Sequence, residues 1–85
     1  MTYEESKVMW QLEKMSFDEA KKNGNTNRNM AKLYDLVEDL IINEKLLYSD
    51  YCNDMSNEFR KAGDGEPEEV VNTVVTNLID KYSNL

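Results

Sequence analysis

The chain has 85 residues, one cysteine, no histidine and a net charge of −7. Its length predicts one domain, residues 1–85, with a modest core. A single cysteine excludes an intramolecular disulfide, and the lack of histidine argues against a zinc site or a histidine-dependent catalytic triad. The negative charge argues against direct binding to nucleic acid, whose backbone is also negative.

The beginning of the chain is polar, and no apolar run approaches the ~20 residues that cross a bilayer. We therefore expect a cytoplasmic protein without membrane contact. The ten asparagines in so short a chain are typical of AT-rich bacterial or phage genomes.

A first helix is predicted over about residues 3–22. Thr2 is a suitable N-cap, and Asn23-Gly24 suits the left-handed conformation that often ends a helix. The helical period then determines which face of this helix each apolar side chain occupies.

Those apolar residues lie on two faces of the predicted helix. Val8, Leu12 and Met15 form one stripe, whereas Trp10 and Phe17 lie on a second face. Either one face packs in the core while the other binds a partner, or both flank a single wide buried stripe.

The stretch Met30–Ala62 has no glycine or proline, and apolar residues recur along it in steps of three and four. This pattern predicts one central helix over about residues 28–62. Only Glu44 interrupts the stripe, and we interpret it as a rim position or as a salt bridge to Arg28, Lys32 or a lysine of the first helix. Such a helix spans roughly 50 Å, which exceeds a compact domain of this length, so a kink near 49–53 is the alternative.

The segment Gly63–Pro67 is the strongest signal for ending one helix and starting another. Apolar residues then follow a nearly regular i, i+1, i+4 pattern, which predicts a last helix over 67–83. The sequence as a whole predicts an all-α fold. We expect a three-helix bundle (about 3–22, 28–62 and 67–83) with one overlong central helix.

Few residues offer catalytic chemistry. Cys52 lies on the apolar stripe and is interpreted as a small core residue. Helical carboxylates are able to hold magnesium, and the candidates for this are Asp35, Glu38, Asp39 and Glu44. All-α nucleotide pyrophosphatases bind magnesium with an acidic pair-plus-one on one helix and a Glu-x-x-Asp on the next, and neither pattern occurs here in order. We therefore expect no enzyme, no cofactor and no metal, and keep a carboxylate–metal helical enzyme as a second alternative.

Most of the excess negative charge lies between residues 49 and 69, which hold seven acids against Arg60 and Lys61. The predicted partner-binding acidic set is Asp50, Asp54, Glu58, Glu66, Glu68 and Glu69. The first three are four residues apart, where like charges repel within a helix. The set is expected to steer a basic partner or to imitate the phosphates of DNA. The alternative is a solvated end that keeps the protein soluble.

These features favour a non-catalytic protein-interaction module, such as an inhibitor, adaptor or immunity-type regulator encoded by a phage or mobile element. Its partner is expected to be a protein with a basic surface. The aromatic residues expected to contact the partner are Trp10, Phe17, Tyr48 and Tyr51. An overlong helix leaves apolar surface without cover, so we also expect a homodimer. The alternative function is an acidic DNA mimic that blocks a nucleic-acid-binding protein.

Overall fold

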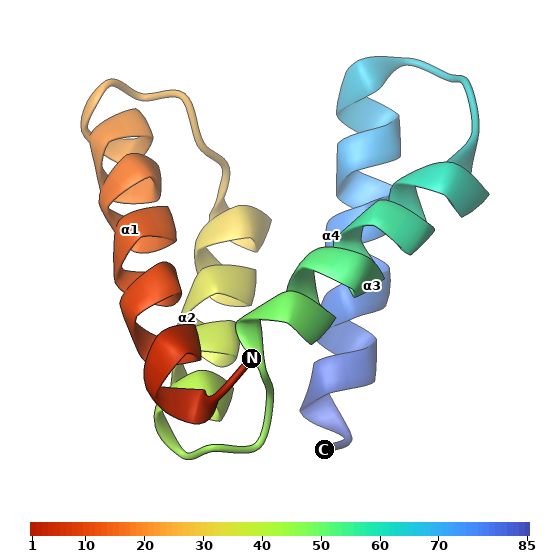
Figure 1. Cartoon of the computed structure of the whole chain (residues 1–85). Coiled ribbons are helices and arrows are strands. Elements are labelled where there is room, and N and C mark those ends of the chain that lie inside the picture. The colour runs from red at the N-terminus through yellow and green to blue at the C-terminus, as the bar shows by residue number, and fades with distance from the viewer.

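The computed structural model describes all residues, 1–85, and contains four α-helices and no strands. They are α1 (Tyr3–Lys22), α2 (Arg28–Ile42), α3 (Tyr48–Ala62) and α4 (Pro67–Ser83). Figure 1 shows two helical hairpins, α1–α2 and α3–α4, whose connecting loops lie at the same end of the molecule. Helix α4 packs against both α2 and α3, and α1 packs against the same two helices from its own side.

The first helix begins and ends where the sequence predicts. At its start the Thr2 hydroxyl accepts the Glu5 N–H at 3.1 Å, and the Glu5 carboxylate accepts the Thr2 N–H at 2.9 Å. This reciprocal capping box satisfies two backbone donors that the helix cannot satisfy itself. At its end Gly24 adopts φ 75°, as the predicted left-handed cap requires.

The predicted central helix over 28–62 is wrong, because two helices separated by a five-residue connection occupy this stretch. The Glu44 N–H donates to the Ile41 carbonyl at 3.1 Å, and the Lys45 N–H donates to the Leu40 carbonyl at 2.8 Å. This pair of bonds is a Schellman motif, which closes a helix by satisfying its last carbonyls. It needs one left-handed residue, and Glu44 supplies it with φ 58°.

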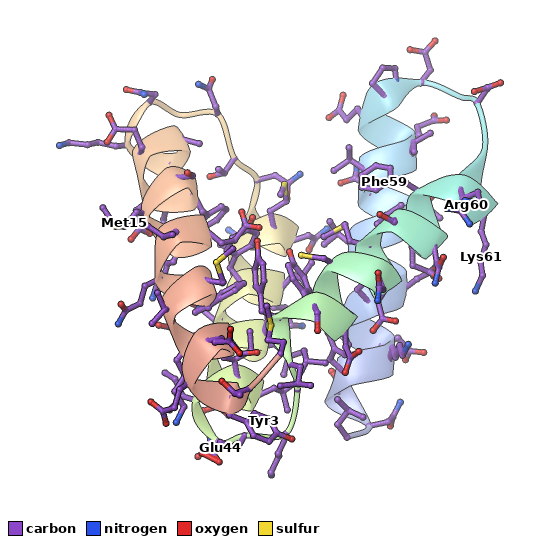
Figure 2. All side chains as sticks on the ribbon, in the orientation of Figure 1. Tyr3, Met15, Glu44, Phe59, Arg60 and Lys61 are labelled. Atoms are coloured by element: carbon purple, nitrogen blue, oxygen red, sulfur yellow. The ribbon has the colours of Figure 1, made fainter.

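The alternative of a kink near 49–53 is wrong as well, since these residues lie inside α3. The break comes earlier, at the one position where the apolar stripe is interrupted. The interpretation of Glu44 as a salt-bridge residue is confirmed, because its carboxylate lies 3.3 Å from the Lys7 ammonium of α1. Glu44 therefore reverses the chain and also joins the connection to α1 (Figure 2).

Helix α3 begins without a capping side chain of its own, because Leu47 stands at the N-cap position. The Ser6 hydroxyl of α1 accepts the Tyr48 N–H at 2.8 Å instead. Ser6 is fully buried and is the only buried polar residue of the protein. A tertiary contact thus performs the task that a local N-cap usually performs.

The core is built around four aromatic rings from three helices. Trp10 of α1 packs against Tyr34 of α2 and Tyr51 of α3, with ring centroids 5.3 Å and 5.7 Å apart. Phe17 stacks on Tyr34 at 4.0 Å. The remaining buried apolar residues are Leu33, Val37, Leu40, Ile41, Leu46, Val74, Val75, Leu78 and Tyr82. The Trp10 face of α1 is therefore its buried face, and the second apolar face of this helix points outward.

Replacing Glu44 with glycine tests the position of the break. We expect Glu44→Gly to stabilise the protein by up to about 1 kcal/mol, since glycine adopts the left-handed conformation without steric cost. A continuous helix predicts the opposite sign, a loss of about 1 kcal/mol. Urea denaturation measures the change, and Lys45→Gly, one residue outside the left-handed position, is expected to destabilise the protein.

Replacing Ser6 with alanine tests the tertiary cap. We expect Ser6→Ala to lower the free energy of unfolding by about 1–2 kcal/mol, because the Tyr48 N–H loses its acceptor at a half-buried position. Ser16→Ala is the matched control, since Ser16 is exposed on the same helix. Both variants replace a helical serine with alanine, so both gain the same intrinsic helix propensity. Equal stabilities of the two variants would therefore show that Ser6 does not cap α3.

Candidate functional site

The six acidic residues predicted to bind a partner do not form one surface. Asp54 accepts hydrogen bonds from the Tyr82 hydroxyl at 2.8 Å and from the Lys81 ammonium at 3.0 Å, so it ties α3 to the last turn of α4. Glu66, Glu68 and Glu69 lie exposed at the opposite end of α4, which is about 20 Å away by the helical rise. The carboxylates therefore have different surroundings at the two ends of α4.

The remaining two members of that set lie between these ends. Glu58 pairs with Lys61 at 3.3 Å one turn further along α3. Asp50 is exposed in the first turn of α3, where the helix dipole favours a negative charge. Asp50, Asp54 and Glu58 thus each have a local structural role beside any role in binding.

The four aromatic residues predicted to contact a partner belong to the interior. Trp10 and Tyr51 are each 2 % exposed, and Phe17 is buried beside them. Tyr48 is half-buried. A partner reaches the first three only if the helices separate, so the contact surface has to be sought elsewhere.

The outer face of α1 is the most exposed apolar surface of a helix in this protein. We define it by five residues that are 40–67 % exposed: Met1, Val8, Met9, Leu12 and Met15. Figure 2 shows Met15 projecting from the side of α1 that is turned away from the other helices. Together these side chains expose on the order of 500 Å² of apolar surface, near the upper end of the range for a monomeric protein.

The inner face of α1 carries a polar contact as well as the aromatic rings. The Glu13 carboxylate accepts the Tyr34 hydroxyl at 3.2 Å with one oxygen and the Tyr48 hydroxyl at 3.1 Å with the other. Burial and the nearby Glu13 charge raise the pKa of Tyr34 to about 12, and burial likewise raises the pKa of Tyr48. Both hydroxyls therefore keep their protons at neutral pH and remain donors to Glu13.

Three of the four carboxylates considered for magnesium, all but Asp35, make contacts of other kinds. Glu38 pairs with Lys14, Glu44 pairs with Lys7, and Asp39 accepts the Asn43 side-chain amide at 3.2 Å. No group of three or more histidine, cysteine or acidic side chains converges so as to hold a metal ion.

No helix combines the length and the apolar character that a membrane crossing requires. No protein-family model, curated protein or solved structure matches this chain. Its function has to be inferred from its own surfaces.

Proposed function

We propose that this chain is a non-catalytic helical interaction module that pairs with a second copy through the outer face of α1. One observation carries the proposal: α1 fills the core with its Trp10 face and still exposes Val8, Leu12 and Met15 on the other. Exposed leucine, valine and methionine in one stripe reduce solubility unless another surface covers them.

The distribution of these residues along α1 favours an antiparallel pair. Leu12 lies at the middle of Tyr3–Lys22, with Val8 and Met15 on either side of it. A twofold axis near Leu12 therefore brings Val8 of each copy close to Met15 of the other, as a self-complementary patch requires.

The charges at the ends of α1 favour the same direction. Its first turn holds Glu4 and Glu5, and its last turn holds Lys21 and Lys22. An antiparallel arrangement places the acidic start of each copy beside the basic end of the other, and it also opposes the two helix dipoles. A parallel arrangement places like charges together at both ends.

The patch is small for the interface of a stable dimer. Two copies contribute roughly 1,000 Å² of apolar surface, and the polar rim raises this to the lower part of the range for stable complexes. We therefore expect a dimer that dissociates at micromolar concentration.

Pairing through α1 leaves the α3–α4 hairpin free. This side carries most of the negative charge of the protein, at residues 49–69. Although these carboxylates do not form one patch, their summed charge speeds the approach of a basic protein and disfavours an acidic one. The proposed function is thus that of a dimeric adaptor or inhibitor whose further partner has a basic surface.

Introducing a charge at the centre of the outer face tests the proposal. Sedimentation equilibrium between 5 and 500 µM covers a range of about 100-fold that brackets the expected dissociation constant. Over this range the mass is expected to rise from 9.9 kDa toward twice that value. Leu12→Glu is expected to stay monomeric throughout, because antiparallel pairing brings the two new carboxylates together at the twofold axis.

Asn77→Glu is the matched control, since Asn77 is exposed on α4 and its replacement changes the charge equally. It should dimerise like the unmodified protein. A wild-type mass that stays at 9.9 kDa up to the highest concentration would refute the proposal.

A further inference from the structure

A groove of about 370 Å³ lies among all four helices, apart from the outer face of α1. Its lining residues are Glu13 of α1, Met30 and Tyr34 of α2, Tyr51, Cys52, Met55 and Phe59 of α3, and Val71 and Val75 of α4. Phe59, near the end of α3 on the side of α4 (Figure 2), is the most exposed of the large apolar lining residues at 40 %. A concave apolar lining with very few polar groups is typical of sites for small organic ligands.

Glu13 is the only charged residue of this lining. Neutral tyrosine hydroxyls hold both of its oxygens, and none of the five ion pairs of the protein includes it. Lys14, the next residue, pairs with Glu38 instead. The groove therefore contains a fixed negative charge that no cation of the protein neutralises.

The two tyrosine hydroxyls use only part of the hydrogen-bond acceptor capacity of the Glu13 carboxylate. An ionised carboxylate offers about four lone-pair sites, so each Glu13 oxygen is able to accept a further hydrogen bond. A charge beside apolar surface gains more from a cation than the same charge in water does, because the surrounding dielectric is lower. The tyrosines hold the carboxylate in place, so little side-chain entropy is lost when a ligand binds.

The other lining residues suit the apolar part of such a ligand. The Phe59 ring is 40 % exposed and attracts cations as well as apolar groups, whereas Tyr34 and Tyr51 are packed in the core and form the floor of the groove. Met30 and Met55 have flexible side chains that adapt to ligands of different shape. The volume lies at the lower end of the range for ligand pockets, which limits the ligand to about one ring with a short chain.

We propose that this groove binds a small organic cation, in which a protonated amine on a short chain pairs with Glu13 and an aromatic ring packs against Met55, Phe59 and Val71. The residues of the outer face of α1 do not line the groove, so the proposal stands whether or not the protein forms a dimer.

The five methionines provide a direct test. Met30 and Met55 line the groove, whereas Met1, Met9 and Met15 lie on the outer face of α1. In protein with ¹³C-labelled methionine methyl groups, we expect 2-phenylethylammonium at pH 7 to shift the signals of Met30 and Met55 and to leave those of Met9 and Met15 in place.

Two further probes of similar shape, one uncharged and one negatively charged, isolate the role of the Glu13 charge. We expect 2-phenylethanol to bind about tenfold more weakly than the ammonium, and phenylacetate more weakly still. Glu13→Gln should reduce the affinity for the ammonium to that for the alcohol and leave the alcohol unaffected. Glu19→Gln, which removes an exposed charge of the same helix, should bind the ammonium like the unmodified protein.

Several results would overturn the proposal. Equal affinity for the ammonium and the alcohol would mean that the groove is apolar only, and the absence of shifts at Met30 and Met55 at millimolar probe would mean that it binds neither. Shifts confined to Met9 and Met15 would place binding on the outer face of α1. If Glu13→Gln fails to fold, the comparison of the three probes on the unmodified protein still decides the question.

Discussion

The hydrogen bond from the Tyr48 N–H to the buried Ser6 hydroxyl is the contact on which the capping of α3 depends. It fixes the start of α3 against α1 at the point where the chain has just left α2. Without it, the first turn of α3 has no side-chain acceptor at its N-terminus, since Leu47 provides none. The N-terminal cap of α3 is therefore supplied by α1 and not by a residue of its own connection.

Beside the packing of α4 on α2, the same face of α1 makes further contacts that join the hairpins. Ser6, Trp10, Glu13 and Phe17 follow one another at steps of four, three and four, so they lie on one side of the helix. Trp10 packs between rings from α2 and α3, and Glu13 accepts a hydroxyl from each of these helices. One helix face thus holds both α2 and α3. This role leaves the outer face of α1 exposed in the monomer, which is why we propose it as the dimer interface.

The sequence predicts the ends of α1 and α4 well because local chemistry determines them. Thr2 and Gly24 form caps that depend on neighbouring residues only. The connection between α2 and α3 escaped prediction because Glu44 takes a left-handed conformation that glycine or asparagine usually takes. The apolar period continues across this connection, so periodicity does not reveal the break. The only sign of it in the sequence is the interruption of the apolar stripe at Glu44.

The surface positions of the predicted binding residues depend on tertiary packing more than the helix ends do. The two apolar faces of α1 are similar in the sequence, and only contact with α2 and α3 selects the Trp10 face for the core. The acidic residues are close in the sequence, yet Asp54 turns toward Tyr82 while Glu68 and Glu69 lie at the far end of α4. The charge of a segment is visible in its composition, whereas the surface that the charges form is set by the crossing of the helices.

The distance between spin labels on two copies of α1 tests the proposed pairing most directly. In a Cys52→Ser background, labels at Gln11→Cys lie near the twofold axis, and we predict a separation below about 20 Å. Labels at Lys22→Cys lie near the helix end, and the helical rise predicts about 30 Å for an antiparallel pair. Short distances at both positions would indicate a parallel pair, and no distance below about 40 Å (more than a whole α1 apart) at either position would show that α1 does not form the interface.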